Sequence, residues 1–482
     1  MIRKLITGLS IYLPSYPKAL VYMLQSTEYQ VRPYLKWVWR TTDFRSVMQR
    51  RTLDRTKAAR LLLLALRLGI VAQLAIGLLL IYLGVYHDVM YALPGGLGLI
   101  VLYPYVWPYL VVVPIELGRW LISKPAEKLA VEESGIIFAQ HQAVKIAVAG
   151  SYGKTTMKEL LATVLSEGLK VAVTPANKNV SGSHAQFAKS LKGDEDVLVI
   201  EYGEGAPGDV ERFARVTQPT HAIITGLAPA HLDQYKTLHA AGEDIFSVGR
   251  YLKGQHVYVN DESPSLKRFL KKSYHLFDRH GALGWKVSEI VVDFSGTSFT
   301  LKKGKHSLKL QSQLVGKHQV GFLALAAALS LELGLTMAQV KAGVAATKPF
   351  EHRMQPYKLA GAWIIDDTYN GNLEGIRAGT ELLHDLKAGR KIYVTPGLVD
   401  QGEETERVHK QVGHLIAAAK PDLVVLMKNS VTEYIKAGLD KANYKGEVQV
   451  EDKPLEFYTN LQHFVAHGDL VLMQNDWTDN YA

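Results

Sequence analysis

Two long stretches of the chain carry almost no charge, and they constrain its fold more than any other feature. Residues 61–86 contain a single charged side chain, and residues 89–115 contain none. Each stretch exceeds the roughly 20 apolar residues that cross a bilayer core as a helix. Only His87 and Asp88 separate the two stretches, so the sequence predicts a transmembrane helical hairpin over residues 61–117. The alternative is a pair of buried core helices, which seldom run so far without a charge.

The positive charge of the chain is gathered beside this hairpin. The net charge is +9, and residues 1–60 hold 12 Lys and Arg against 3 Asp and Glu, so the rest of the chain is neutral. A neutral body argues against nucleic-acid binding, which needs basic residues along the folded domains. Basic residues flank both ends of the hairpin, nine of them before the first stretch and three soon after the second. This pattern places both ends, and the domains that follow, on the cytoplasmic face of the membrane.

Residues 1–60 are therefore interpreted as a basic juxtamembrane segment in contact with membrane lipid. Its first 30 residues either lie along the anionic inner surface or form a plain basic linker. Pro14 and Pro17 interrupt their apolar residues, which argues against a signal peptide. Residues 118–143 are interpreted as a linker. The chain has no cysteine, which excludes disulfides, thiolate metal sites and a cysteine nucleophile.

From Val144 the pattern changes to alternating strands and helices. A short β-branched strand, residues 144–149, precedes Gly150-Ser-Tyr-Gly-Lys-Thr-Thr156, and a helical run follows it. Strand, glycine turn, Lys-Thr and helix together predict a phosphate-binding loop, because backbone N–H groups converge there at a helix N-terminus. Lys154 would neutralise the β- and γ-phosphates and the Thr155 hydroxyl would bind Mg²⁺. The usual pattern has glycine where this chain has Val148.

Polar side chains follow two further predicted strands. Glu201 ends the strand that begins at Val197, and His231 lies a few residues after the strand that begins at His221. The carboxyl ends of parallel strands form the usual ligand-binding edge of a sheet. A carboxylate and an imidazole beside a magnesium–nucleotide are plausible metal ligands.

Taken together, these residues resemble the Mur ligase family, ATP-dependent amide ligases of cell-wall peptide synthesis, and within it the MurF branch. The resemblance covers about residues 144–472, and its landmarks occur in the family's order. Beyond the phosphate loop, Glu201 and His231, they are Asn177-Lys-Asn179 with Gly182, Gly316-Lys-His-Gln319, Glu351-His-Arg353, Asp366-Asp-Thr-Tyr-Asn-Gly-Asn372, and Gly397-Leu-Val-Asp-Gln-Gly402 with His409.

The resemblance implies an α/β fold with two catalytic domains behind the transmembrane hairpin. The expected domains are a central P-loop ATPase domain, residues 144–350, and a C-terminal Rossmann-like domain, residues 351–482. Residues near 286–311 are expected to form a small antiparallel extension of the first. The chain is expected to be a monomer.

The resemblance also implies roles for single residues. ATP would be bound by the phosphate loop. Gln319 would contact the adenine, Arg353 would contact the γ-phosphate, and Asp367 would face the nucleotide from the C-terminal domain. Mg²⁺ would be bound by Thr155, Glu201 and His231, and Asn370 would help place the incoming amine. The residues of the loop are Gly150, Ser151, Tyr152, Gly153, Lys154, Thr155 and Thr156. The expected catalytic residues are Lys154, His231, Arg353 and Asn370.

The chain departs from the family in several places. The family commonly carries a carbamylated lysine that holds a second magnesium, and here no lysine occurs in Ala240-Ala-Gly-Glu243-Asp244-Ile-Phe246. Glu243 is expected to supply that carboxylate directly; the alternatives are Asp244 and a second metal that is bound more weakly. Where the family often ends its last strand with Lys-Gly-Ser, this chain has Gln474-Asn475-Asp476. The identity of the acceptor amine is therefore open.

The sequence thus predicts a membrane-anchored ligase that activates a carboxylate as an acyl phosphate and joins it to an amino acid or dipeptide. The hairpin and basic segment stand where MurF enzymes bind the UDP-sugar. Either that moiety is recognised elsewhere, or the carboxylate substrate is lipid-linked or already polymeric and is presented at the membrane. The alternatives to a peptidoglycan-precursor ligase are a poly-γ-glutamate or capsule-type ligase, and a non-catalytic nucleotide-binding scaffold.

Overall fold

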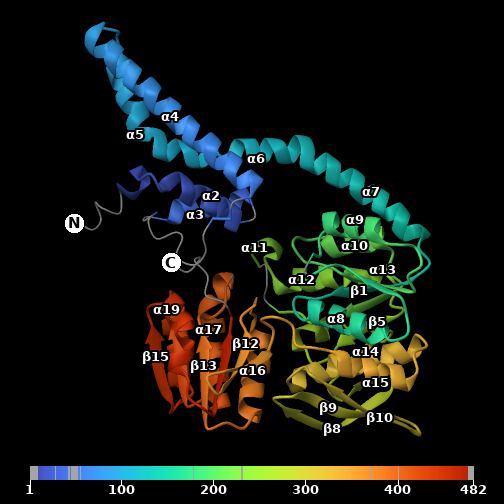
Figure 1. Ribbon diagram of the computed structural model, residues 1–482. Helices are drawn as coiled ribbons and strands as arrows, with labels where there is room; N and C mark the ends of the chain where they lie inside the picture. The colour runs from blue at the N-terminus through green and yellow to red at the C-terminus, as the bar shows by residue number, and fades with distance from the viewer. Residues whose placement is uncertain are drawn as a thin grey trace. The chain divides into compact units, whose positions relative to one another are not determined.

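The computed structural model describes residues 9–27, 29–41, 44, 53–54, 56–176, 178–228, 232–369, 371–399 and 401–475. Their helices and strands are labelled in Figure 1. The chain forms two compact units, which divide after Ala126. Each unit has a hydrophobic core of its own.

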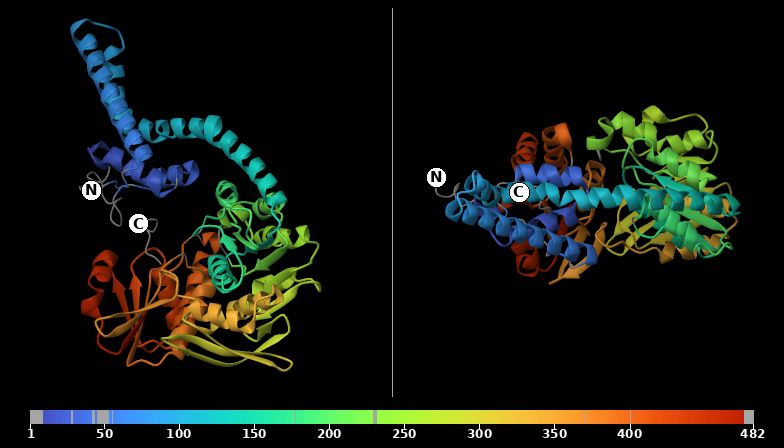
Figure 2. Two further views of the ribbon diagram at one scale, coloured as in Figure 1. Left: turned by 45° about the vertical axis from the view of Figure 1, so that its right-hand side comes forward. Right: turned by 90° about the horizontal axis from the view of Figure 1, so that it is seen from above.

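The first unit is built around a helical hairpin. Helix α4, Lys57–Tyr86, and helix α5, Ala92–Leu110, lie side by side in both views of Figure 2. The Thr56 side chain caps α4 by accepting a hydrogen bond from the Ala59 N–H at 3.1 Å. The predicted helices are therefore present. By length and composition, α4 and the continuous helical stretch that begins with α5 are long and apolar enough to cross a membrane.

A tyrosine hydroxyl supplies a backbone hydrogen bond of α5 that a proline removes. Pro108 has no N–H, so the Pro104 carbonyl four residues earlier loses its helical donor. The Tyr16 hydroxyl donates to this carbonyl at 2.6 Å and replaces the missing donor. In an apolar environment such repair is needed, because no water is present to take its place.

The helices that precede the hairpin pack against it. They are η1 Leu9–Tyr12, α2 Tyr16–Ser26 and α3 Val31–Arg40. Eight of the 11 residues of α2 are buried, and seven of these form one core with Leu66 and Ile70 of α4 and with Val111 and Val112. The apolar residues of this segment thus contact other helices, which neither sequence interpretation of residues 1–30 foresaw.

The segment expected to be a linker, residues 118–143, is helical as far as Gln140. Helix α6, Val112–Gly118, continues through a π-helical turn, η2 Arg119–Ser123, into α7, Lys124–Gln140. Ala, Leu, Glu and Lys dominate the start of α7, and all of them favour helix. The sequence analysis gave this segment no secondary structure, because the apolar stretch ends before the helix does.

The second unit contains a ten-stranded sheet in the order β10-β9-β8-β7-β6-β5-β4-β1-β3-β2. Strands β1 to β6 are parallel, and β7 to β10 form the predicted antiparallel extension. Separate hydrophobic cores cover the two faces of this sheet. The strands are β1 Val144–Ala149, β2 Val171–Val173, β3 Val197–Glu201, β4 His221–Ile224, β5 Val257–Asn260, β6 His275–Asp278, β7 Gly281–Ala282, β8 Trp285–Asp293, β9 Gly296–Lys303 and β10 His306–Ser312. The helices are α8 Lys154–Leu165, α9 Ser181–Ser190, α10 Asp209–Thr217, α11 Leu232–Tyr235, α12 Leu238–Ile245, α13 Ser247–Tyr251, η3 Pro264–Phe269, η4 Lys317–Gln319, α14 Val320–Glu332 and α15 Met337–Ala346.

A six-stranded sheet follows in the order β11-β12-β16-β13-β14-β15, shown in orange to red in Figure 1. Only β11 is antiparallel, so the predicted parallel Rossmann-like sheet is confirmed. The strands are β11 Gln355–Leu359, β12 Ala362–Asp367, β13 Arg390–Thr395, β14 Leu423–Met427, β15 Glu447–Glu451 and β16 Asp469–Gln474. The helices are α16 Leu373–Asp385, η5 Gly402–Glu404, α17 Thr405–Ala419, α18 Thr432–Lys441, α19 Pro454–Thr459 and α20 Leu461–Phe464.

Ion pairs join the helix α16 to the ten-stranded domain. Arg279 donates to Glu381 at 2.8 Å, and Lys317 pairs with Asp385 at 2.8 Å. The Phe294 and Trp363 rings stack with their centroids 4.6 Å apart. These contacts hold the two sheets of the second unit together beside η4.

Candidate active site

The turn between β1 and α8 has the backbone geometry of a phosphate-binding loop. Gly150 and Gly153 have φ values of +139° and +77°, which side chains other than glycine rarely adopt. A Cβ on Gly150 would lie 2.4 Å from the Thr225 hydroxyl oxygen. That hydroxyl donates to the carbonyls of Ala149 and Tyr152, so the end of β4 fixes the loop. Helix α8 begins directly after Gly153, with the free N–H groups that its first turn leaves for a ligand.

The other residues of the loop contact Gly226 or pack into helix α8. The Ser151 N–H donates to the Gly226 carbonyl at 2.8 Å. The Tyr152 ring lies against Gly226, where an added Cβ would come within 2.2 Å of it, and burial raises the pKa of this tyrosine. Thr156 is buried in the first turn of α8.

Lys154 is held by an acidic residue that the sequence analysis did not identify. Its Nζ donates to the Glu204 carboxylate at 2.7 Å and to the Gly150 carbonyl at 2.5 Å. The side chain of Glu204 is 4% exposed and that of Lys154 12%. Glu204 lies three residues beyond Glu201, in the loop at the carboxyl end of β3. This place at the ligand-binding edge of the sheet is the one feature of the sequence that could have identified Glu204.

Thr155 and Glu201 meet as the sequence analysis expected. The Thr155 hydroxyl donates to Glu201 Oε1 at 3.1 Å, and the Asn179 amide donates to the same oxygen at 3.2 Å. Glu201 is 2% exposed, and its other oxygen, Oε2, accepts no hydrogen bond. A buried carboxylate oxygen without a donor, next to a hydroxyl, fits a hard divalent cation such as Mg²⁺.

Lys158 is a second residue that the sequence analysis missed. Its side chain is fully buried, and its Nζ lies 3.6 Å from Glu201 Oε2 and 3.1 Å from Glu159 Oε1. It donates to the carbonyls of Thr174 and Ala176, in the loop that leads to Asn179. Lys158 lies one helical turn after Lys154, among the buried residues of α8. This spacing puts both lysines on the same face of the helix, and it is the feature of the sequence that could have identified Lys158.

The remaining expected metal ligands are not assembled in the described residues. His231 lies outside them. The Glu243 carboxylate is half exposed and pairs with Arg250 at 2.9 Å. Asp244 is buried, and its two oxygens accept hydrogen bonds from the Gly208 N–H and the Tyr235 hydroxyl. Within the described part of the chain, no three His, Asp or Glu side chains lie close enough together to hold a metal.

Gln319 opens the buried helix α14, as expected for a residue near a nucleotide base. Its amide nitrogen lies 2.9 Å from His318 Nε2, and its buried carbonyl oxygen accepts no hydrogen bond. Burial lowers the pKa of His318 to about 4, so the imidazole is neutral at pH 7 and accepts from the amide. The unpaired amide oxygen is suited to an N–H donor such as an amino group of a base.

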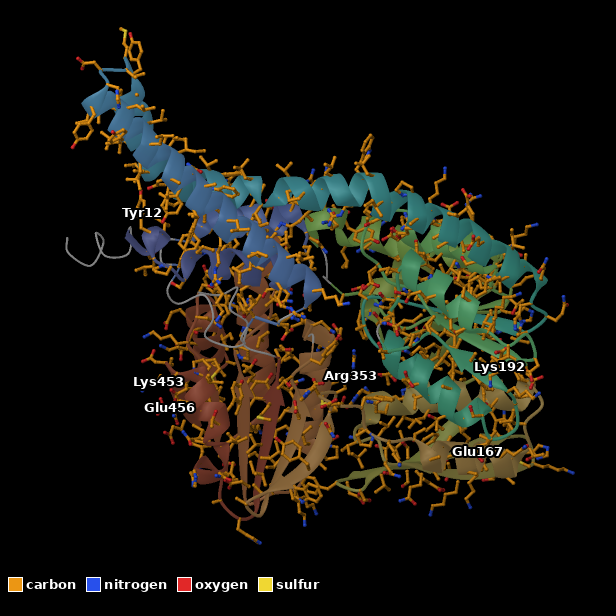
Figure 3. All side chains as sticks on the ribbon, turned by 45° about the horizontal axis from the view of Figure 1, so that its top comes forward. Tyr12, Glu167, Lys192, Arg353, Lys453 and Glu456 are labelled. Carbon is orange, nitrogen blue, oxygen red and sulfur yellow. The ribbon has the colours of Figure 1, made fainter. Side chains whose placement is uncertain are left out.

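The C-terminal domain adds Arg353 and Asp367. Arg353, labelled in Figure 3, lies over the Tyr369 ring, with its guanidinium carbon 4.6 Å from the ring centroid. Burial raises the pKa of Asp367 to about 7, although Gln474 donates to its carboxylate at 2.7 Å and Arg353 lies near enough to oppose the rise. Asn370 lies outside the described residues.

Comparison with known proteins identifies relatives of both domains. A family model described as the Mur ligase middle domain matches residues 148–330, and one described as the Mur ligase glutamate ligase domain matches residues 352–474. The UDP-N-acetylmuramoyl-tripeptide–D-alanyl-D-alanine ligase of Escherichia coli (strain K12) is 29% identical over 328 residues, which cover 64% of this chain and 72% of the relative. The enzyme of the same name from Bacillus subtilis (strain 168) is 24% identical over 333 residues, covering 68% and 72%.

Solved structures share the fold. The MurF ligase from Thermotoga maritima in complex with ADP superposes with a TM-score of 0.64 at 22% identity, covering 73% of this chain and 80% of that one. A MurF structure from Acinetobacter baumannii gives a TM-score of 0.63 at 21% identity, covering 72% and 77%.

Proposed function

The chain belongs to the Mur ligase family of ATP-dependent acid–amino-acid ligases, and on that premise we propose that it is a membrane-anchored, MurF-like ligase of peptidoglycan precursor synthesis. In this proposal the carboxylate of a muramoyl peptide attacks the γ-phosphate of ATP, which gives an acyl phosphate and ADP. The amine of an amino acid or dipeptide then attacks the acyl carbon, and inorganic phosphate leaves from the tetrahedral intermediate.

One observation carries the proposal: the loop of Gly150 to Thr155 joins a lysine, a hydroxyl and the buried Glu201 carboxylate at one helix N-terminus. The N–H groups and Lys154 suit the oxygens of a transferring phosphoryl group, whose charge they neutralise. When bound, Mg²⁺ would polarise the phosphates, and Thr155, Glu201 and His231 are the residues proposed to hold it.

The C-terminal domain is proposed to complete the site. Arg353 supplies a cation for the γ-phosphate and Asp367 faces the nucleotide, while Gln319 of the central domain contacts the adenine. Asn370 places the amine. The contacts of Asp367 with Gln474 and of Arg353 with Tyr369 support this, because they hold both side chains in fixed orientations before a nucleotide binds.

The hairpin is proposed to anchor the enzyme with its catalytic domains on the cytoplasmic face, where ATP is available. Apolar helices α4 and α5 and the basic residues at both of their outer ends support this orientation. Anchoring raises the local concentration of a carboxylate substrate that is itself lipid-linked.

A second candidate, a poly-γ-glutamate or capsule-type ligase, differs in its carboxylate and amine substrates. The last strand ends in Gln474 and Asn475, whose side chains donate to Asp367 and Thr395, where the family often has a lysine. Because that positive charge is absent here, the acceptor amine need not be D-alanyl-D-alanine, and the glutamate used by a poly-γ-glutamate or capsule-type ligase is the alternative. A non-catalytic scaffold is the remaining alternative.

Release of ADP by the purified full chain tests these candidates. UDP-muramoyl peptides are offered with D-alanyl-D-alanine or with glutamate, and a ligase releases ADP only when carboxylate and amine are both present. Lys154→Ala should abolish turnover, whereas Lys192→Ala, a change at an exposed lysine labelled in Figure 3, should not. ADP release that ignores both substrates, or that survives Lys154→Ala, would refute the ligase.

A further inference from the structure

A groove runs along the helical hairpin between α4 and α5. Its volume is about 640 Å³, which is in the range of sites that hold small molecules. Residues between positions 69 and 76 of α4 and between positions 95 and 107 of α5 line it, and all of them are apolar except Gln73. The interval on α5 rises about 18 Å, slightly more than half of a bilayer core of roughly 30 Å. A long apolar groove of this kind suits one extended hydrocarbon chain.

Small residues create the groove, and a hydrogen-bonded pair fixes its wall. A Cβ added to Gly95 or Gly98 would meet no other part of the described structure within 4 Å, so the space beside them is open. On the other side of the groove, the Trp107 ring packs against Gly69. The Trp107 indole N–H donates to the Gln73 side-chain oxygen at 2.7 Å, and the Gln73 amide donates to a backbone carbonyl of α5 at 3.0 Å. These bonds satisfy a polar side chain that is costly at membrane depth, and they hold the ring in place.

Helix α3 presents a basic face beside the end of α5. Its basic residues, Arg32, Lys36 and Arg40, are exposed and spaced four residues apart, so they lie on one face of the helix. No acidic residue occurs in α3. Trp39 lies on the same face, and its indole N–H donates to the Tyr109 hydroxyl of α5 at 2.7 Å. This hydrogen bond joins the basic face of α3 to the end of the hairpin.

The end of the groove and the basic face of α3 are close enough for one molecule to contact both. Tyr109 follows the last residue of the groove, Trp107, by two positions, which is about 3 Å along a helix. Trp and Tyr side chains gather at the level of lipid headgroups, and the Trp39 side chain is 72% exposed beside Tyr109. Arg40 follows Trp39 directly, and a guanidinium forms strong hydrogen bonds with phosphate. An apolar chain in the groove would thus end where a phosphate meets positive charge.

We propose that the groove binds the hydrocarbon chain of a lipid-linked carboxylate substrate, and that the basic face of α3 binds the phosphate at the end of that chain. This inference rests on the proposed function, because it takes the carboxylate substrate of the ligase to be lipid-linked. One groove beside one cationic face suits a lipid that joins a single long chain to phosphate, whereas a membrane phospholipid carries two chains. The hairpin then selects the substrate in addition to anchoring the enzyme.

Counting bound lipid tests the proposal without turnover. The full chain is purified in detergent, and the lipid that stays bound is measured by native mass spectrometry over a range of lipid concentrations. The probe is geranylgeranyl phosphate, a single chain with a terminal phosphate. Geranylgeraniol lacks the phosphate, and dioleoylphosphatidylglycerol is an anionic lipid with two chains. The wild type should bind one geranylgeranyl phosphate, and it should bind each of the other two lipids at least about tenfold more weakly, as expected for the loss of one good contact.

Variants separate the groove from the basic face. Gly98→Leu should weaken the binding of geranylgeranyl phosphate about tenfold or more, because the new side chain displaces about two buried methylene groups of the lipid. Gly118→Leu is the matched control, since a Cβ there also meets open space but lies outside the groove, and it should bind like the wild type. The double variant Arg32→Gln and Arg40→Gln should bind geranylgeranyl phosphate only as weakly as the wild type binds geranylgeraniol.

Each other outcome overturns a stated part of the inference. Equal binding by the wild type and Gly98→Leu, or no binding by the wild type, would refute the groove. Equal binding of geranylgeraniol would refute the phosphate contact, and equal binding of dioleoylphosphatidylglycerol would show a site for bulk lipid instead of substrate. If Gly98→Leu does not fold, Gly95→Leu fills the same groove and decides. A wild type that binds the probe but releases ADP without regard to carboxylate and amine would refute the proposed function alone.

Discussion

Replacing Lys158 with methionine should destabilise the second unit by breaking a buried ion pair. Methionine keeps most of the length and apolar volume of the lysine side chain, so the main loss is the charge. Lys158 is fully buried, and its Nζ lies 3.6 Å from the Glu201 carboxylate, which is 2% exposed. At an effective dielectric constant of about 20, two unit charges at that distance attract by about 4–5 kcal/mol.

This figure agrees with the penalty known for such changes. Removing one partner of a buried pair typically costs about 3–5 kcal/mol, because the other charge stays buried without compensation. For a domain of about 200 residues each kcal/mol corresponds to roughly 2–4 °C in melting temperature, so Lys158→Met should melt roughly 6–20 °C lower. The control is Lys189→Met, which removes an exposed ion pair with Glu133 and should cost about 0–1 kcal/mol.

Thermal unfolding of the full chain in detergent measures both effects. Added Mg²⁺ and ADP should restore more stability to Lys158→Met than to the wild type, because the cation replaces the missing counter-charge of Glu201. A melting temperature of Lys158→Met equal to that of Lys189→Met would refute the ion-pair argument. An equal gain from Mg²⁺ and ADP in both proteins would refute the placement of the cation at Glu201.

Three further predictions concern topology, pH and the helical hairpin. A cysteine at position 88 of this cysteine-free chain should react with an impermeant maleimide from outside intact cells, and labelling only after the cells are opened would contradict the orientation. The pKa of Asp367 is raised in the folded protein to about 7, above the usual value of about 3.9, so its contribution to stability should be present in acid and lost as the pH rises through about 7. Asp367→Asn should remove that part of the pH dependence of the melting temperature, and identical profiles would contradict it. Tyr16→Phe leaves the Pro104 carbonyl without a donor and should cost the first unit about 1–3 kcal/mol in detergent, whereas Tyr82→Phe, at an exposed tyrosine, should not.

Sequence patterns with a short period predicted most of the architecture. The uncharged stretches gave α4 and α5, since a helix needs only an unbroken run of apolar, helix-forming residues. The β-branched runs gave β1, β3 and β4, and glycines at fixed offsets gave the phosphate loop. In each case the interactions that form the element act within about 20 residues, so a short stretch of sequence is enough to predict it.

The end of a helix and the partners of a strand were harder to foresee. The helix over most of residues 118–143 was not foreseen, because it continues beyond the apolar run that marks its earlier part. The antiparallel strand β11 was not foreseen, because its pairing with β12 satisfies backbone groups that the sequence does not distinguish. The packing of α2 against α4 and α5 likewise has no local signature.

The sequence by itself determined the residue types that the chemistry needs, namely Lys154, Thr155 and Glu201 at the end of a parallel strand. Only the tertiary structure decided which charges face them. Glu204 lies 50 positions from Lys154, Lys158 is 43 positions from Glu201, and Gln474 is 107 positions from Asp367. Such pairs depend on strand register and burial across the whole sheet, and a buried charge is stable only where the fold brings a partner to it.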